Sequence, residues 1–208
     1  MIVGTLGALR RYPVKSLRGE SVDAAEITST GIAGDRVAAI FVREGHARAG
    51  NTYRGKENEH LHLAGDADAA LALARERGVG VECRHGERYF DDAPISIVVD
   101  RWIEELSALL GYAVEWERFR PNFFVRATPA FGDPESALCG ADLQLGGALL
   151  RVRSAIERCV TITYHPAGKP SDPNLLRVLA QQRGNLMGIY CDVVKPGIAR
   201  AGDALARL

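Results

Sequence analysis

The sequence has no excess of charge of either sign. Lysine plus arginine and aspartate plus glutamate each number 26, so the formal net charge is zero. Binding to nucleic acid or to an anionic membrane surface therefore has no support from bulk electrostatics. We expect no nucleic-acid partner and no membrane partner, and any cation-rich site must be local.

Cysteine is scarce and long apolar runs are missing. The four cysteines include no Cys-x-x-Cys pair and no histidine nearby at zinc-like spacing, which argues against a zinc site or a disulfide framework. No stretch approaches the length of a membrane span, and the apolar start Met1 to Leu9 lacks the basic leading segment of a signal peptide. These absences predict a reducing, cytoplasmic setting.

Short apolar runs separated by turn residues dominate the rest of the chain. Four runs have the composition of strands: Ile2–Leu9, Val37–Val42, Ile95–Val99 and Met187–Val194. A half-buried strand is also predicted where Val114 and Trp116 alternate with acidic residues. Val79–Cys83 and Arg88–Phe90 flank His85-Gly86-Glu87 as a hairpin would. Helices are predicted over about 66–77, 100–110 and 172–184. Many strands with three helices predict a mainly β, α+β protein of barrel type.

Cys159 is the residue with the most chemical potential. It follows Arg158, and apolar strand-like residues stand on both sides, in Ile156 and in Val160–Thr163. A neighbouring guanidinium favours the thiolate, which is the form that attacks electrophiles or binds a metal. The alternative is that Cys159 is a small buried hydrophobe, the common state of an intracellular cysteine.

Several cations stand at strand or loop ends beside Pro, Gly or Cys. A surface lysine or arginine usually serves solvation, but this group together with two polar neighbours suggests an anion pocket, since arginine offers a planar fork to phosphate or carboxylate. Asn122 can donate and accept hydrogen bonds, which suits the edge of a heterocycle. The residues in question are Lys15, Ser16, Arg36, Arg120, Asn122 and Arg158. The polar stretch 44–59 is interpreted as a solvated loop, with a substrate lid as the alternative.

Five motifs in order resemble those of MOSC-domain proteins, the relatives of the C-terminal domain of molybdenum cofactor sulfurase that include the amidoxime-reducing component. The motifs are Tyr12-Pro13-Val14-Lys15-Ser16-Leu17-Arg18-Gly19-Glu20, Gly31-Ile32-Ala33-Gly34-Asp35-Arg36, Phe119-Arg120-Pro121-Asn122, Arg158-Cys159 and Gly202-Asp203. They span nearly the whole chain. The sequence departs from the family at Glu157, where small residues are usual, and at Met187, where phenylalanine is usual.

The resemblance implies a fold, a cofactor and a set of ligands. It implies a MOSC β-barrel built from residues 1–36 and 92–208, with 37–91 as a small, reduced inserted lobe. It also implies a molybdenum-pterin cofactor, with Cys159 as the metal ligand and catalytic residue. Contacts to the pterin and its phosphate would come from Lys15, Ser16, Arg36, Arg120, Asn122 and Arg158, with Asp91 as a further pocket residue. Cys83, Cys139 and Cys191 match nothing in the family pattern and are interpreted as structural.

Two functions of different kinds follow from this resemblance. The first is an oxidoreductase that reduces small N-hydroxylated compounds and takes electrons from a separate donor protein. The second is a carrier of sulfur or of the cofactor, which would hold a persulfide on Cys159 and work with a sulfurase. No pyridoxal phosphate site is expected in a chain of this length. A binding module that has lost the cofactor is a third reading, against which the retention of every cationic motif argues.

Overall fold

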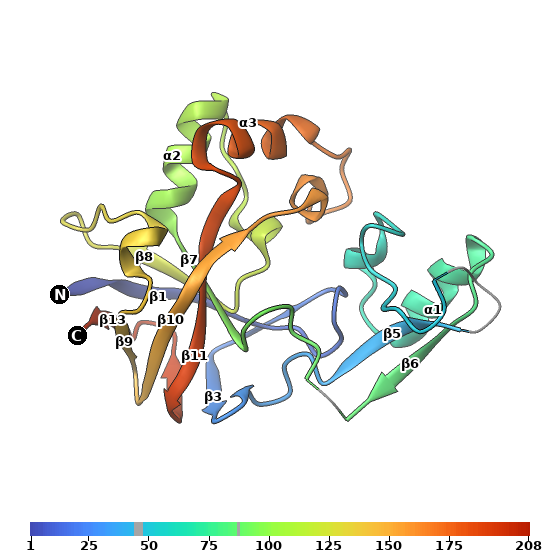
Figure 1. Ribbon diagram of the computed structural model, residues 1–208, viewed down its shortest axis with the longest axis horizontal. Helices are drawn as coiled ribbons and strands as arrows, with labels where there is room; N and C mark the ends of the chain where they lie inside the picture. Colours follow the sequence, from blue (N-terminus) through green and yellow to red (C-terminus); the bar gives the residue numbers. More distant parts are fainter. Residues whose placement is uncertain (44–47, 87) are drawn as a thin grey trace.

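The computed structural model describes residues 1–43, 48–86 and 88–208. Its main feature is a barrel of seven strands, in which each strand pairs with the next and β13 pairs back onto β1 (Figure 1). β7 and β8 run parallel, and the other neighbours are antiparallel. In order around the ring the strands are β1 (Ile2–Arg11), β13 (Ala204–Arg207), β9 (Asp142–Leu145), β10 (Ala148–Glu157), β11 (Leu186–Lys195), β7 (Ile95–Val99) and β8 (Phe123–Ala127). The predicted mainly β, barrel-type fold is confirmed.

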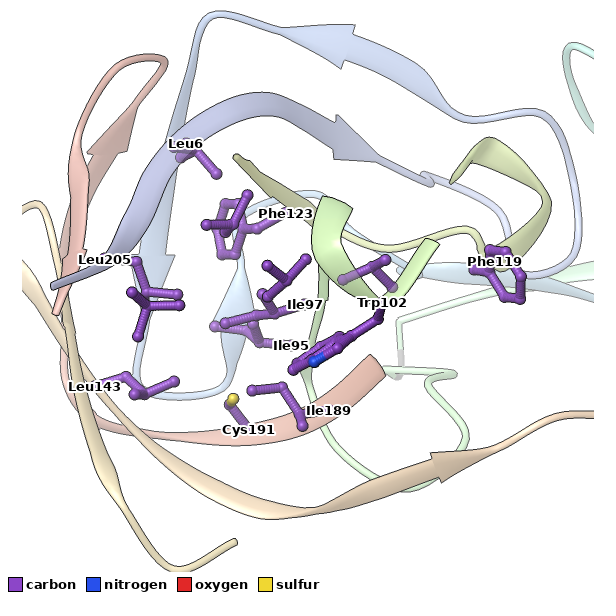
Figure 2. Packing of buried hydrophobic residues seen from close by; sticks show 14 of the residues in the cluster. Leu6, Ile95, Ile97, Trp102, Phe119, Phe123, Leu143, Ile189, Cys191 and Leu205 are labelled. Carbon is purple, nitrogen blue, oxygen red and sulfur yellow. The ribbon is translucent and has the colours of Figure 1, made fainter. Parts of the chain in front are cut away.

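The barrel is filled by one large hydrophobic cluster. Leu6, Ile97, Phe123 and Leu205 lie in it, contributed by strands from both ends of the chain (Figure 2). β7 is buried at all five positions, which explains why its sequence is a continuous apolar run without alternation. Four further strands lie outside the ring: β2 (Glu20–Val22) pairs with β1, and β12 (Gly197–Arg200), β3 (Ala24–Thr28) and β4 (Gly31–Ile32) form a separate sheet.

The two longer barrel helices form where the sequence predicts them. α2 spans Asp100–Leu110 and ends at Gly111 in the left-handed conformation. Asp172 accepts a hydrogen bond from the Asn174 amide and begins α3 (Pro173–Arg183), and α3 packs against α2. No helix in the described residues is long and apolar enough to cross a membrane.

A smaller unit lies beside the barrel. β5 (Ala38–Val42) and β6 (Val81–His85) pair with each other and pack against α1 (Ala67–Glu76) around a separate hydrophobic cluster that includes Ile40 and Leu61 (Figure 1). The short η1 helix (Leu61–Leu63) belongs to the same unit. Leu17 also packs in this cluster, although it precedes residue 37. Treating residues 37–91 as an inserted lobe therefore remains a proposal, with Leu17 as a contribution from outside those bounds.

Three local predictions are wrong. Val114–Trp116 is not a strand, because Trp116–Phe119 forms the 3-10 helix η2. β6 pairs with β5, and Arg88–Phe90 is not a strand, so the predicted hairpin does not form; its residue 87 lies outside the described residues. The run after Cys159 forms the 3-10 helix η4 (Val160–Thr163), since β10 ends at Glu157. A further 3-10 helix, η3, spans Glu135–Leu138.

Candidate functional site

A cleft of about 840 Å³ brings together most of the residues that the sequence singled out. Seven of the eight predicted site residues line it, and they come from five separate parts of the chain: Lys15, Ser16, Arg36, Asp91, Arg120, Arg158 and Cys159. Within the described residues, its lining holds nine lysines and arginines against five aspartates and glutamates. The molecule as a whole is neutral, so this excess makes the cleft a local site for anions.

Tyr12 organises the base of the cation group. The guanidinium groups of Arg36 and Arg120 both contact its ring, with their central carbons 4.9 Å and 4.4 Å from the ring centroid. The Tyr12 hydroxyl donates to the carbonyl of Pro121 at 3.2 Å, and its backbone amide donates to Asp35 Oδ1 at 2.7 Å. Tyr12 is 2% exposed, and burial raises the pKa of its phenol. A neutral aromatic ring therefore contacts both cations.

The two arginines on Tyr12 differ in charge balance. Burial lowers the pKa of Arg36, but Asp35, whose Oδ2 is 2.5 Å from Arg36 Nη1, more than offsets this, and the pKa is raised overall. Burial also lowers the pKa of Arg120, and the nearby Arg36 adds to that effect. Arg120 donates to the carbonyl of Leu17 at 2.6 Å and is not paired with a carboxylate in the described chain. Its positive charge is available to an anion in the cleft.

Backbone strain is concentrated at this site. Among the described residues, four that are not glycine have positive φ: Ser16 (70°), Arg36 (48°), Arg120 (50°) and Asn185 (66°). Three of them line the cleft, and the Asn185 carbonyl accepts from the Arg158 amide at 2.9 Å. A left-handed backbone is costly for residues with a side chain and persists where the surroundings impose it, most often at functional sites.

Arg158 is held deep in the wall of the cleft by backbone carbonyls. Its Nε donates to Met187 at 2.7 Å and its Nη1 to Phe119 at 2.9 Å, while Nη2 is buried without a hydrogen-bond partner among the described residues. Burial lowers the pKa of Arg158 to about 10. A buried donor without a partner is costly, so Nη2 is a position where a ligand acceptor would be stabilising.

Asn122 lies behind the cleft wall and does not line it. Its Oδ1 accepts from the backbone amide and the hydroxyl of Ser96, at 3.1 Å and 3.0 Å, and from Arg36 Nη1 at 3.3 Å. Its Nδ2 donates to the carbonyl of Arg10 at 3.3 Å. Asn122 therefore joins β7 to β8 and orients Arg36, and in this arrangement its amide group is occupied by protein partners.

Lys15 and Asp91 form an ion pair across the mouth of the cleft, with Nζ 2.6 Å from Oδ1. The Lys15 side chain is 16% exposed and that of Asp91 69%. Burial opposes the charge on Asp91, but Lys15 more than offsets this and lowers the pKa of the carboxyl. Lys15 is thus half-buried.

Cys159 immediately precedes η4, and its side chain is exposed at the cleft. Its Sγ lies 3.2 Å from Thr161 Oγ1. The interpretation of Cys159 as a buried hydrophobe is therefore wrong, and Cys191, in the barrel core, is the buried cysteine of the chain. That Arg158 favours the thiolate form of Cys159 stays a prediction. In the described ranges no three His, Cys, Asp or Glu side chains are grouped to hold a metal ion.

Sequence reasoning missed several cleft residues. Arg10, Tyr12, Arg54 and Tyr164 all line it, and Arg10 Nε and Arg54 Nε are also buried donors without partners among the described residues. Tyr12 could have been predicted to line the cleft, because it stands in the same motif as Lys15. Arg54 was covered only by the alternative interpretation of the stretch 44–59 as a substrate lid, because the composition of that stretch favours a solvated loop.

The site is a cation-rich cleft with an exposed thiol, set against a closed barrel. The MOSC domain profile matches residues 81–206, and that of the MOSC N-terminal beta barrel domain matches residues 3–65. The chain belongs to the MOSC family, whose domains are associated with the molybdenum cofactor.

Solved structures agree with this assignment at the level of the fold. The YuaD protein of Bacillus subtilis superposes with a TM-score of 0.59 at 20% identity, covering 98% of this chain and 94% of that one. A crystal structure described as a hypothetical protein gives 0.51 at 17% identity, covering 100% of this chain and 69% of that one. No curated protein matches the sequence significantly.

Proposed function

We propose that the protein binds a molybdenum-pterin cofactor in this cleft and uses it to reduce N-hydroxylated compounds. The observation that carries the proposal is the convergence of seven residues from five parts of the chain on one cation-rich cleft with an exposed thiol. In the family resemblance these are residues that hold the cofactor and its metal. Lys15 and Cys159 are far apart in the sequence, and the fold brings both to the same cleft.

The donor set fits such a group. The buried Arg158 Nη2 and Arg10 Nε have no partners among the described residues, so each offers a hydrogen bond to an acceptor in the cleft. Arg36 and Arg120 present positive charge suited to a phosphate. The Cys159 sulfur is a soft ligand of the kind that a redox metal takes. When bound, the cofactor would supply a metal centre that gains and loses two electrons.

The protein residues orient the cofactor and balance its charge. Lys15, Arg36, Arg120 and Arg158 hold the anionic part, and Asn122 acts from behind by fixing Arg36. Cleavage of an N–O bond consumes two electrons and two protons and releases water, leaving the N–H compound. The electrons would come from a separate electron-donor protein.

Replacement of Cys159 tests this function. We expect Cys159→Ala to lose at least about 100-fold in reduction of benzamidoxime by the loaded protein, because a metal ligand contributes to both binding and electronic tuning. Cys139→Ala is the matched control, since Cys139 is also exposed but lies outside the cleft. Full activity in Cys159→Ala, or equal losses in both variants, would contradict the proposal.

The exposure of Cys159 also favours a second candidate, a sulfur carrier. Both Cys159 and its neighbour Val160 (37% exposed) are reachable by another protein. A donor persulfide would transfer its outer sulfur to Cys159 and leave as a thiol. Mass spectrometry would then find one extra, reductant-labile sulfur on Cys159 in protein that contains no molybdenum.

A further inference from the structure

The segment Arg54-Gly55-Lys56 forms the wall of the cleft that faces Cys159. It follows the buried Tyr53 of the smaller unit, and all three residues line the cleft. A Cβ on Gly55 would be 3.0 Å from Thr161 Cγ2. Thr161 in turn contacts Cys159, so this segment lies within one side chain of the proposed metal ligand. Anything that reaches Cys159 from this side passes Arg54 and Lys56.

Neither cation of this segment forms an ion pair with a carboxylate among the described residues, although the charge of Arg54 contributes to lowering the pKa of Asp91. Arg54 Nε is buried and has no hydrogen-bond partner there, and no carboxylate pairs with Lys56. The nearest acidic residue in sequence, Glu57, is already engaged: one oxygen pairs with Arg48 and the other accepts from the Arg54 backbone amide at 2.8 Å. A buried guanidinium nitrogen in this state is stabilised by an anionic acceptor.

A flat aromatic surface lies next to these cations. The rings of Tyr164 and His62 stack with centroids 5.9 Å apart and an interplanar angle of 18°, and both residues line the cleft. The His62 ring also hydrogen-bonds to the carbonyl of His165 at 2.9 Å, which fixes the pair against the segment after η4. An aromatic ring can pack on such a surface with an anionic substituent toward Arg54.

We propose that the substrate is an aromatic N-hydroxylated compound that carries a carboxylate or a phosphate. Arg54 and Lys56 bind the anionic group, and Tyr164 contacts the ring beside Cys159. This assignment rests on the proposed reductase function and adds the substrate class. Arg54 and Lys56 are distinct from Arg36, Arg120 and Arg158, which the proposed function assigns to the cofactor. Substitutions can therefore remove the substrate's anion site and leave the cofactor's residues in place.

Substrates that differ in charge test the assignment. Benzamidoxime, its 4-carboxylate and its 4-phosphate ester are compared with a chemically reduced viologen as the electron donor. We expect kcat/KM at least about 10-fold higher for an anionic compound than for the neutral one, as charge-assisted hydrogen bonds would give. Whichever anion is preferred identifies the substrate as a carboxylate or a phosphate ester. In Arg54→Gln/Lys56→Gln the ratio should fall to about one.

A control variant and a binding measurement keep the two proposals apart. Lys195→Gln removes an exposed cation at the end of β11 that does not line the cleft, and it should keep the wild-type ratio. Calorimetric titration of the same compounds without an electron donor gives affinity independent of turnover. Charge-selective binding that Arg54→Gln/Lys56→Gln abolishes, without any turnover, would sustain the anion site and reject the reductase. Equal affinity for neutral and anionic compounds would overturn the anion site, whatever the turnover.

Discussion

At the scale of single residues, the site depends on a few positions whose backbone or packing is unusual. Gly188 is one of them. Its φ is +85°, and a Cβ there would lie 2.7 Å from the Ile97 carbonyl oxygen and 3.1 Å from Arg158 Nη2. Its amide also donates to the buried Glu135 at 3.3 Å. A side chain at this position would therefore displace the β7 backbone or the Arg158 guanidinium.

We expect Gly188→Ala to lower the free energy of unfolding by roughly 3 kcal/mol, since left-handed strain costs about 1–2 kcal/mol and overpacking a further 1–3. Gly184→Ala is the matched control, because its φ is +60° but nothing lies within 4 Å of the added Cβ. It should cost only about 1 kcal/mol. Urea denaturation of both variants measures the difference, and equal losses would contradict the crowding at Gly188.

The motif residues show how far sequence reasoning reaches at this scale. Lys15 and Arg36 could be predicted because each stands in a short motif with turn residues beside it, and Arg158 because it directly precedes Cys159. The contact of Arg36 and Arg120 with Tyr12 could not, since it depends on side chains brought together from three separate parts of the sequence. Asn122 was predicted to contact the cofactor, but its side-chain amide already makes hydrogen bonds with Ser96 and Arg36. The local sequence does not reveal these partners.

At the scale of elements, the contact between the smaller unit and η4 shapes the Cys159 side of the cleft. η1 and the residues after η4 meet through the His62–Tyr164 stack and the hydrogen bond from His62 to the His165 carbonyl. A Cβ on Gly168 would lie 3.1 Å from Leu63, so this second contact is also close. The arrangement of these elements was not predictable, because the sequence favoured a strand where η4 forms.

This contact is expected to weaken in acid. Burial lowers the pKa of His62, with smaller contributions from the charges of Arg120 and His60, while hydrogen bonds to the carbonyls of His165 and Glu59 act in the opposite direction. In the unfolded chain His62 has the ordinary histidine pKa of about 6.5, which is higher than its pKa in the folded chain. As pH falls, the unfolded chain therefore binds a proton at His62 before the folded chain does, and the free energy of unfolding falls.

Unfolding measured between pH 7 and pH 5 tests this linkage. His62→Gln should show a shallower loss of stability with acid than the wild type. Replacement of the exposed His85 by Gln is the control, since His85 is not among the groups that act on His62, and it should keep the wild-type slope. An unchanged slope in His62→Gln would place the acid sensitivity elsewhere in the molecule.

At the scale of the whole molecule, the barrel brings the first and last strands of the chain together. β13 pairs with β1 across roughly 200 residues of sequence, for example Leu205 with Gly4, and β7 pairs in parallel with β8 through the connection that contains α2. The sequence predicted most of the individual strands, because runs such as Ile95–Val99 are locally apolar. It could not give their order in the ring, because pairing partners are chosen by packing in the closed barrel and not by local propensity.

The most direct test of the account is the molybdenum and pterin content of protein purified from a host that makes the cofactor. Wild-type protein and Cys139→Ala should each contain about one molybdenum and one pterin per chain, while Cys159→Ala should lose most of the metal. Molybdenum absent from the wild type, or present equally in all three proteins, would contradict the assignment of Cys159 and its cleft as the cofactor site.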